Sequence, residues 1–209
     1  MMNIIFCGSK GKTGSIVFNY LKELNYNIVS EVNVNEKNLI EVIKPNSIVI
    51  DFTNKEVCYN HAITCLENDC HFICGTTGLS KEQIAFLTSR AQNKQLYFEF
   101  NPNFSLGINK LIPLLSNLKE YYTDIKIIES HHISKKDLPS GTALLLKEHL
   151  KENTPIDSIR TTYQSLDHTI ILKNEYEEIT IKHSVKNKLA YAMGVENSLK
   201  TLLANQKYD

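Results

Sequence analysis

The sequence predicts an α/β fold in which a doubly wound parallel sheet is followed by a second, smaller α+β architecture. Short apolar runs alternate with segments of helical periodicity between Ile4 and Phe100, glycine-containing turns separate many of them, and the pattern changes after Asn103. Such alternation implies parallel strands with helices on both faces of the sheet. With 209 residues, 42% of them hydrophobic, the chain is long enough for one good core or two small ones.

The elements of the first architecture follow from the spacing of the apolar residues. Strands are expected where short apolar runs end at glycine, aspartate or a polar turn. They lie at residues 4–7, 28–32, 47–51, 71–74 and 96–100. Helices are expected where apolar residues recur three and four positions apart. They lie at residues 15–24, 39–43, 57–66 and 81–91.

The second architecture begins with a long helical pattern at residues 108–118 and a strand at 125–128. A polar loop is expected at 129–141, followed by a helix at 142–150. Apolar, β-rich stretches lie at 170–172 and 179–185, and a helix closes the chain at 190–203. Because no long linker separates the two parts, we expect them to pack as neighbouring domains.

Charge and hydropathy exclude several classes of partner. The 23 basic and 23 acidic side chains balance, so no net field attracts the chain to nucleic acid or to an anionic membrane. No apolar run approaches the roughly 18 residues that a membrane-spanning helix needs, and the first residues do not resemble a signal peptide. We therefore expect a cytoplasmic protein that binds neither nucleic acid nor membrane.

The five cysteines predict neither a disulfide framework nor a metal site. They are Cys7, Cys58, Cys65, Cys70 and Cys74, an odd number in apolar surroundings. Cys65, Cys70 and Cys74 lie near His71, and thiolate and imidazole are zinc ligands, but the spacing does not match a short zinc knuckle. Buried, inert thiols are the expected outcome.

The glycines mark a predicted nucleotide site. Gly8, Gly11 and Gly14 lie between an apolar strand and a helix, where backbone amides and the helix dipole can hold a pyrophosphate. The motif lacks the second glycine of the usual GxGxxG, so by itself it is also compatible with a plain turn. The segments 51–53 and 75–78 follow strands at the same sheet edge, which favours a single crevice with a ligand.

The segment 129–142 carries the residues suited to catalysis. Ser140, Gly141 and Thr142 at a helix start offer hydroxyls and N–H groups to a carboxylate, and Lys135 supplies the countercharge. The expected ligand is a small anion, and His131 or His132 is suited to donate a proton near neutral pH. A solvated basic loop before a capped helix is the alternative. His61, His149 and His183 have no partner motif and are expected to pack at the surface or in the core.

Taken in order, these segments resemble the 4-hydroxy-tetrahydrodipicolinate reductase family. The matching stretches are 8–14, Asp51-Phe52-Thr53, Gly75-Thr76-Thr77-Gly78, 102–109 and the His-His-x-x-Lys-x-Asp-x-Pro-Ser-Gly-Thr signature at 131–142. The resemblance spans nearly the whole chain. It implies an NAD(P)H-dependent reduction of a conjugated imine in a dicarboxylate substrate, in lysine and diaminopimelate biosynthesis.

The resemblance also implies an architecture. Residues 1–104 with 188–209 would form a Rossmann-like dinucleotide-binding domain. Residues 105–187 would form a substrate-binding domain whose sheet builds a homotetramer, with the site between the two domains.

Residue roles are carried over from the matching positions. His131 is the implied proton donor, and Lys135 is a second donor and carboxylate anchor. His132, Ser140, Gly141 and Thr142 are implied to bind substrate. The implied cofactor-binding residues, for NADPH, NADH or both, are Gly8, Ser9, Lys10, Gly11, Lys12, Thr13, Asn33, Phe52, Thr53, Gly75, Thr76, Thr77, Asn101, Pro102, Asn103, Phe104 and Lys188.

The chain departs from the family pattern at several positions. It is shorter than usual, Lys12 replaces an arginine, and Thr161, Thr162 and Leu166 replace glycines. Because threonine tolerates positive φ poorly, these replacements call the loop conformation into question. Glu31 has the spacing of an NAD-selecting acid, whereas Asn33 aligns with the family's usual acid, which favours dual or NADPH use.

Two other functions remain open at this point. One is a different Rossmann dehydrogenase of amino-acid metabolism, acting on a semialdehyde or on homoserine. The other is a catalytically silent, nucleotide-binding oligomeric homologue.

Overall fold

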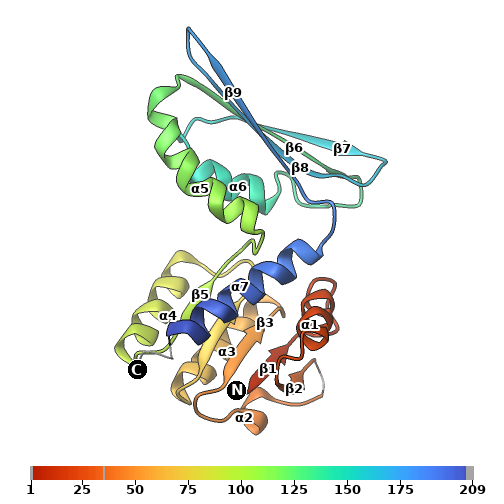
Figure 1. Ribbon diagram of the computed structural model, residues 1–209, viewed down its shortest axis with the longest axis vertical. Coiled ribbons are helices and arrows are strands. Elements are labelled where there is room, and N and C mark those ends of the chain that lie inside the picture. The colour runs from red at the N-terminus through yellow and green to blue at the C-terminus, as the bar shows by residue number, and fades with distance from the viewer. Residues whose placement is uncertain (1, 35, 206–209) are drawn as a thin grey trace. The chain divides into compact units, whose positions relative to one another are not determined.

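The computed structural model describes residues 2–34 and 36–205. The chain forms two compact units. The first runs to Phe104 and takes in the segment from Lys188 onward, and the second is Ser105–Asn187. Each unit has its own sheet and its own hydrophobic core (Figure 1).

The first unit contains a five-stranded parallel sheet in the order β2-β1-β3-β4-β5. Its strands are β1 (Ile4–Cys7), β2 (Ile28–Val32), β3 (Ile48–Asp51), β4 (His71–Cys74) and β5 (Phe98–Phe100). Its helices are α1 (Gly14–Glu23), α2 (Leu39–Val42), α3 (Lys55–Glu67), α4 (Lys81–Asn93) and α7 (Leu189–Asn205). Every residue of β1, β3 and β4 is buried, as expected for strands covered on both faces.

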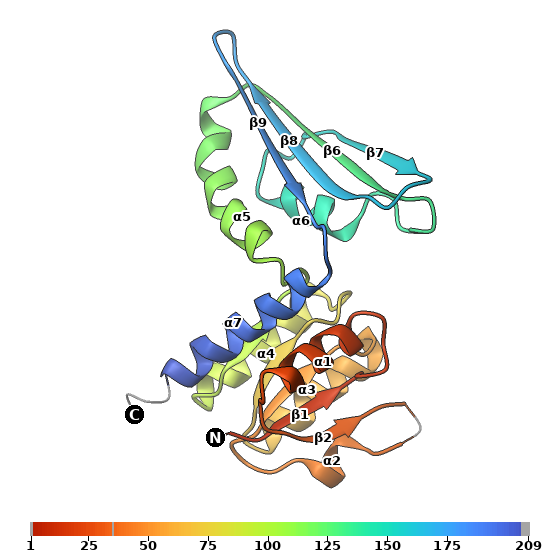
Figure 2. The same cartoon turned by 45° about the vertical axis from the view of Figure 1, so that its right-hand side comes forward.

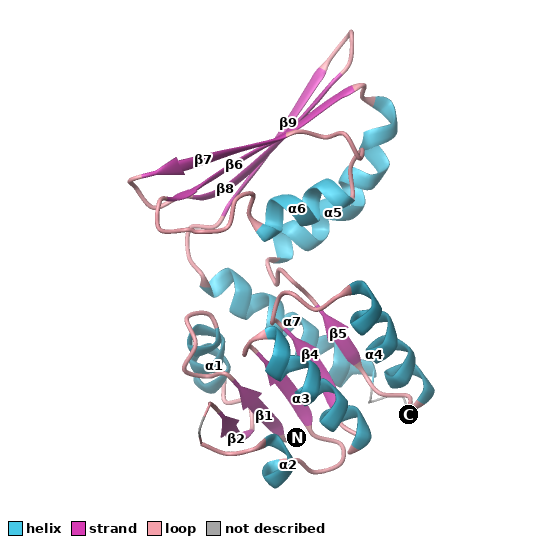
Figure 3. Cartoon of the chain, turned by 180° about the vertical axis from the view of Figure 1, so that it is seen from behind, coloured by secondary structure: helices cyan, strands magenta, loops and turns pink. Residues whose placement is uncertain are grey.

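Two cores lie on opposite faces of this sheet. Strand residues such as Val49 and Phe72 pack with α3 and α4, which Figure 3 shows in front of the sheet. Strand residues such as Ile50 and Ile73 pack with α1 and α7. This arrangement confirms the predicted doubly wound parallel sheet.

The second unit is a four-stranded mixed sheet in the order β7-β6-β8-β9. Its elements are α5 (Leu106–Leu118), η1 (Lys119–Tyr121), β6 (Asp124–His132), α6 (Gly141–Glu148), β7 (Ile156–Thr161), β8 (Leu166–Lys173) and β9 (Glu178–Ser184). Strand β7 runs parallel to β6, whereas β8 and β9 continue the sheet antiparallel.

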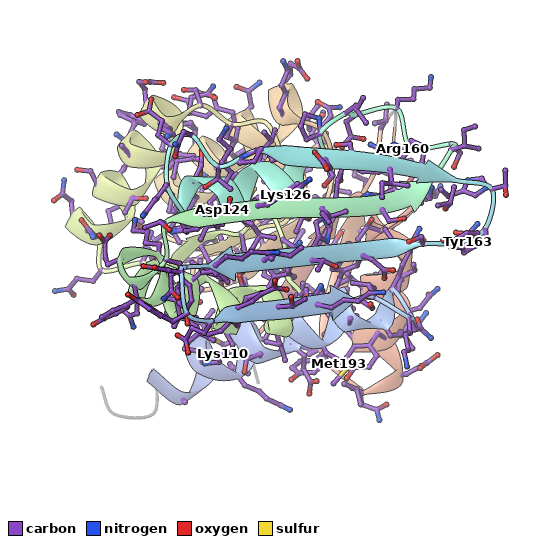
Figure 4. The ribbon with its side chains drawn as sticks, turned by 90° about the horizontal axis from the view of Figure 1, so that it is seen from above. Lys110, Asp124, Lys126, Arg160, Tyr163 and Met193 are labelled. Carbon is purple, nitrogen blue, oxygen red and sulfur yellow. The ribbon has the colours of Figure 1, made fainter. Side chains whose placement is uncertain are left out.

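Helices α5 and α6 cover one face of this sheet (Figure 2). Ile108 and Leu115 of α5 and Leu146 of α6 pack on the inward residues of the strands. Strand alternation points the other set of side chains, including Lys126, to the opposite face, onto which Figure 4 looks.

One expectation for the second unit was wrong, and one strand was missed. The strand predicted at 125–128 continues to His132, so Glu129–His132 belongs to β6 and not to a polar loop. Strand β7 was not expected at all. Apolar periodicity failed in both places because polar residues occupy inward positions. Glu129 accepts hydrogen bonds from Arg160 there, and His131 lies beside it.

The cysteines are all buried and free, as predicted. Cys58 and Cys74 bring their Sγ atoms to 3.2 Å, and burial raises the pKa of the Cys7 thiol. No helix of the described residues is long and apolar enough to cross a membrane.

Gly194 of α7 allows that helix to approach the backbone of Phe104. A Cβ atom at Gly194 would overlap the Phe104 carbonyl oxygen, so this helix cannot keep its position with any larger residue. Gly194→Ala is expected to lower the free energy of unfolding by about 3 kcal/mol, measured by urea denaturation. Gly141→Ala is the control, since nothing lies within 4 Å of the added atom. Equal stability of the two variants would contradict this packing argument.

Candidate active site

The turn between β1 and α1 is closed by backbone contacts that only glycine permits. Gly8 has φ +86°, and a Cβ atom there would lie 2.5 Å from the Phe52 carbonyl oxygen. A Cβ atom at Gly14 would overlap the Gly8 carbonyl oxygen. Thr13, the residue before α1, makes no side-chain cap bond. The turn therefore places its backbone at the N-terminus of α1. The N-terminus of a helix is a site where a pyrophosphate can bind.

Asp51, at the carboxyl end of β3, joins the next two loops. Its side chain is fully buried and accepts hydrogen bonds from Thr53 N (2.9 Å), Thr53 Oγ1 (2.7 Å) and Thr76 Oγ1 (2.8 Å). His61 of α3 places Nδ1 2.7 Å from the other carboxylate oxygen. His61, expected only to pack, thus has a specific partner. These bonds fix the loops after β3 and β4, which hold five of the predicted cofactor residues.

The carboxyl end of β2 meets the glycine turn. Ser9 Oγ donates to Glu31 Oε2 at 2.6 Å, and Asn33 Nδ2 donates to Ser9 Oγ at 3.0 Å. The Lys10 amide donates to Asn33 Oδ1 at 3.3 Å, and the Lys10 ammonium pairs with Glu36. Both candidate selectors of the cofactor ribose, Glu31 and Asn33, therefore contact the same serine.

The remaining predicted cofactor residues also lie in the first unit. Asn101 follows β5, its amide donates to the Cys74 carbonyl oxygen at 3.0 Å, and its side chain accepts from the Asn103 amide at 3.1 Å. Burial and the neighbouring charge of Lys12 lower the pKa of Lys188. The predicted set thus gathers at the carboxyl ends of β1 to β5, and its cations are Lys12, Lys188 and Lys10, of which Lys10 is paired with Glu36.

In the second unit a buried polar cluster surrounds Glu129. Glu129, His131 and His168 have exposed fractions of 0%, 3% and 4%. Glu129 Oε1 accepts from the Ser140 amide at 3.1 Å and from both terminal nitrogens of Arg160, at 3.3 and 3.2 Å. Glu129 Oε2 lies 3.0 Å from His131 Nδ1.

His168 lies beside His131 in this cluster. The two rings meet edge to face with centroids 5.2 Å apart, and His168 Nε2 is 3.1 Å from Ser140 Oγ. Burial lowers the pKa of His168 to about 4, with the charge of His131 contributing further. Burial also lowers the pKa of His131, which the charge of Glu129 opposes.

The predicted substrate residues are only partly brought together. Ser140 touches the cluster and caps α6 by accepting from the Ala143 amide at 3.2 Å. Gly141 and Thr142 begin α6 directly after it. His132 follows His131 on β6, so alternation directs it to the other face, and its Nδ1 contacts Ser134 Oγ at 2.8 Å. Lys135 lies in the following loop, paired with Asp137 at 2.8 Å.

Sequence reasoning gave no role to Glu129, Arg160 or His168. The available signal was spacing, since Glu129 and His131 are two residues apart and share a face once the segment is known to be a strand. Arg160 and His168 come from β7 and β8, so only the pairing of these strands with β6 brings them to the cluster.

Two buried groups have the spacing of metal ligands but do not fit a metal ion. Glu129, His131 and His168 offer ligand atoms within 4.8 Å of one another, but the Arg160 guanidinium already neutralises the carboxylate. Asp51 in the second group, with Cys7 and His61, already accepts hydrogen bonds from three side chains and a backbone amide.

The parallel sheet with its glycine turn and the second unit with its buried histidine define a pyridine-nucleotide-dependent oxidoreductase of the Rossmann class. The family models agree with this class over both units. Residues 2–104 match "Dihydrodipicolinate reductase, N-terminus" and residues 107–208 match "Dihydrodipicolinate reductase, C-terminus". The chain belongs to the dihydrodipicolinate reductase family.

Similar proteins are named 4-hydroxy-tetrahydrodipicolinate reductase or dihydrodipicolinate reductase. The 4-hydroxy-tetrahydrodipicolinate reductase of Thermosipho africanus (strain TCF52B) is 30% identical over 198 residues, covering 94% of this chain and 89% of the relative. The 4-hydroxy-tetrahydrodipicolinate reductase of Blochmanniella floridana is 31% identical over 198 residues, covering 81% of this chain and 72% of the relative. A solved dipicolinate-bound dihydrodipicolinate reductase from Paenisporosarcina sp. TG-14 matches with a TM-score of 0.83 and 24% sequence identity. The match covers 97% of this chain and 94% of the solved one, and it shows that the two share a fold.

The lowered pKa of His168 predicts a loss of stability in acid. In the unfolded chain a histidine has a pKa of about 6.5, whereas the pKa of His168 in the folded chain is about 4. Between these values only the unfolded chain binds the proton, so this contribution is complete above pH 6.5 and is lost as the pH falls toward 4. The free energy of unfolding is expected to fall by about 2 kcal/mol between pH 7.5 and pH 5 through this group.

Urea denaturation of the wild type and of His168→Gln at both pH values isolates this contribution. Histidines that do not contact His168 affect both proteins equally, so the variant is expected to lose less stability on acidification. Equal losses would show that His168 is not the responsible group.

Proposed function

We propose that this chain transfers a hydride from NADH or NADPH to the conjugated imine of the 4-hydroxy-tetrahydrodipicolinate series, giving tetrahydrodipicolinate in lysine and diaminopimelate biosynthesis. The observation that carries the proposal is the grouping of His131, the Lys135 loop and the start of α6 around one buried carboxylate. That grouping occurs in a chain that matches the family over both units.

The first unit fits a pyridine nucleotide. Its glycine turn is closed by backbone contacts that a Cβ atom at Gly8 or Gly14 would prevent, and Lys12 and Lys188 add positive charge. The nucleotide, when bound, supplies the hydride. The proposed contacts are made by residues 8–13, the loops fixed by Asp51, and residues 101–104.

Glu31 supports use of the unphosphorylated cofactor. Its carboxylate is exposed at the end of β2, beside Ser9, where a ribose diol can donate to it and a phosphate is repelled. Lys10, the nearest cation of the turn, is paired with Glu36. We therefore propose that NADH is accepted alongside NADPH.

The proposed proton donor is His131. Hydride addition leaves negative charge on the substrate, which a proton from the imidazole neutralises. Burial lowers the pKa of His131, which makes the imidazolium a stronger acid for this transfer. Lys135, with the α6 N-terminus at Ser140, Gly141 and Thr142, supplies positive potential for the two substrate carboxylates. His132 remains a proposed substrate contact that approaches from the other strand face.

The deciding experiment follows the absorbance of the reduced nicotinamide with enzymatically generated substrate. Substrate-dependent oxidation of NADH or NADPH supports the reductase, and the two cofactors run in parallel give the preference. Tight nucleotide binding without turnover would identify the catalytically silent alternative. The five free, buried thiols support action in a reducing compartment such as the cytoplasm.

His131→Gln and Lys135→Gln are each expected to lower kcat at least about a hundredfold, because one removes the proton donor and the other a charge that binds and polarises the substrate. Neither lies in the first unit, so the dissociation constant for NADH, measured by fluorescence titration, is expected to stay within about twofold. Lys136→Gln, at the exposed neighbouring lysine, is the matched control and should retain activity. Normal turnover by either test variant would refute its assigned role.

We also propose a homotetramer assembled through the sheet of the second unit. The face opposite α5 and α6 carries Ile128, Ile159 and Ile171 among paired charges, and Ile159 is 47% exposed. Light scattering of the purified chain is expected to give the mass of four copies, and Ile159→Glu should give a smaller species. A monomeric wild type would refute the assembly.

A further inference from the structure

Glu129 and His131 form a close pair inside the second unit. They are two residues apart on β6, so both point to the face that α5 and α6 cover. Glu129 Oε2 lies 3.0 Å from His131 Nδ1. Neither atom has a hydrogen-bond partner among the described residues, so the contact between them is electrostatic and not a well-formed hydrogen bond. Both side chains are buried, which removes the pair from water.

The other carboxylate oxygen is fully engaged, which fixes the orientation of the group. The Ser140 amide and both terminal nitrogens of Arg160 donate to Oε1 at 3.1 to 3.3 Å. Arg160 also donates to the Asp137 carbonyl oxygen at 2.6 Å, in the loop that carries Lys135. One carboxylate thus connects the histidine, the start of α6 and the lysine loop.

A carboxylate oxygen at this distance determines which ring nitrogen holds the proton. The lone pair of an unprotonated Nδ1 would be repelled by the anionic oxygen, so Nδ1 carries a proton in both states of the ring. The proton that the ring can release is therefore on Nε2. After release, the neutral ring remains in the Nδ1–H form, which the carboxylate stabilises.

The other charges around His131 do not perform this task. Burial disfavours the protonated ring most strongly, and Lys135 in the loop and Arg160 on β7 add to this effect. His168 on β8 packs edge to face against the ring. Asp137 opposes them, but it is exposed and paired with Lys135. Glu129 is the buried group that opposes the lowering of the His131 pKa.

We propose that Glu129 is a positioning residue for the reaction: it holds His131 with Nδ1 protonated and Nε2 presented as the proton-releasing atom. The inference rests on the proposed function for the role of His131. The contact between the two side chains is independent of that function.

The test compares Glu129→Gln with the wild type in the full-length protein. The proton of His131 is followed by NMR of ring-labelled histidine, assigned with His131→Gln. Loss of the negative charge is expected to lower the His131 pKa by about one unit or more. The donor is active when protonated, so activity is lost as the pH rises through its pKa. The alkaline limb of the kcat profile is therefore expected to move to lower pH by the same amount, with KM for the substrate within about twofold.

Two further variants separate positioning from a structural role. Glu129→Asp retains the charge. We expect it to bring the His131 pKa and the position of the alkaline limb of the kcat profile close to their wild-type values. Glu177→Gln makes the same charge change in the same unit, at a residue that contacts Tyr122, and is expected to leave both unchanged. A variant that is merely less stable would lower the amount of active enzyme without moving the limb.

A measurement on the wild type keeps the inference testable even if Glu129→Gln does not fold. Nitrogen-15 shifts above the His131 pKa report which ring nitrogen is protonated. The Nδ1–H form is expected, and the Nε2–H form would overturn the inference. An unchanged His131 pKa in folded Glu129→Gln would overturn it as well. Absence of turnover by the wild type would instead refute the proposed function, while the NMR results would still decide the pairing.

Discussion

A fully buried carboxylate is stable only where enough donors surround it, and each unit of this chain is arranged around one such group. Asp51 and Glu129 both have exposed fractions of 0%. Asp51 draws donors from the loops after β3 and β4 and from α3. Glu129 draws them from α6 and β7. In both cases some of the donors, Thr53 and Thr76 for Asp51 and Ser140 for Glu129, belong to segments with proposed ligand contacts, so satisfying the charge also fixes those segments.

Close backbone packing adds a second constraint in the first unit. The turn after β1 lies against Phe52, whose ring would overlap a Cβ atom at Gly75. Phe52 follows Asp51 directly, so the residue that packs under the glycine turn is positioned by the buried carboxylate. The backbone at Gly8, the proposed pyrophosphate contact, is therefore held by the same interaction that holds Thr53 and Thr76.

The sequence allowed the first unit to be predicted well and the second less well, for a physical reason. Strands β1, β3 and β4 are apolar throughout, so their positions follow from composition alone. The end of β6 is polar on its buried face because Glu129 accepts hydrogen bonds from Ser140 and Arg160 there and lies against His131. No local pattern reveals such a strand. Arg160 and His168 reach the Glu129 cluster only because β7 and β8, which are distant in sequence, pair with β6. The contact of His61 with Asp51 likewise depends on the packing of α3.

The structure accommodates Thr161, Thr162 and Leu166, which replace glycines of the family pattern, without backbone strain. Among the described residues, the non-glycine positions with positive φ are Asn25, Asn46, Asp69 and Gln95, so none of the three replacements is strained. Thr161 instead ends β7 and Leu166 begins β8, where branched and apolar side chains are favoured. Leu166 and Arg160 are the β-pairing partners of His131 on its two sides. Pairing of β7 and β8 with β6 at these positions therefore holds the backbone of the proposed proton donor from both sides.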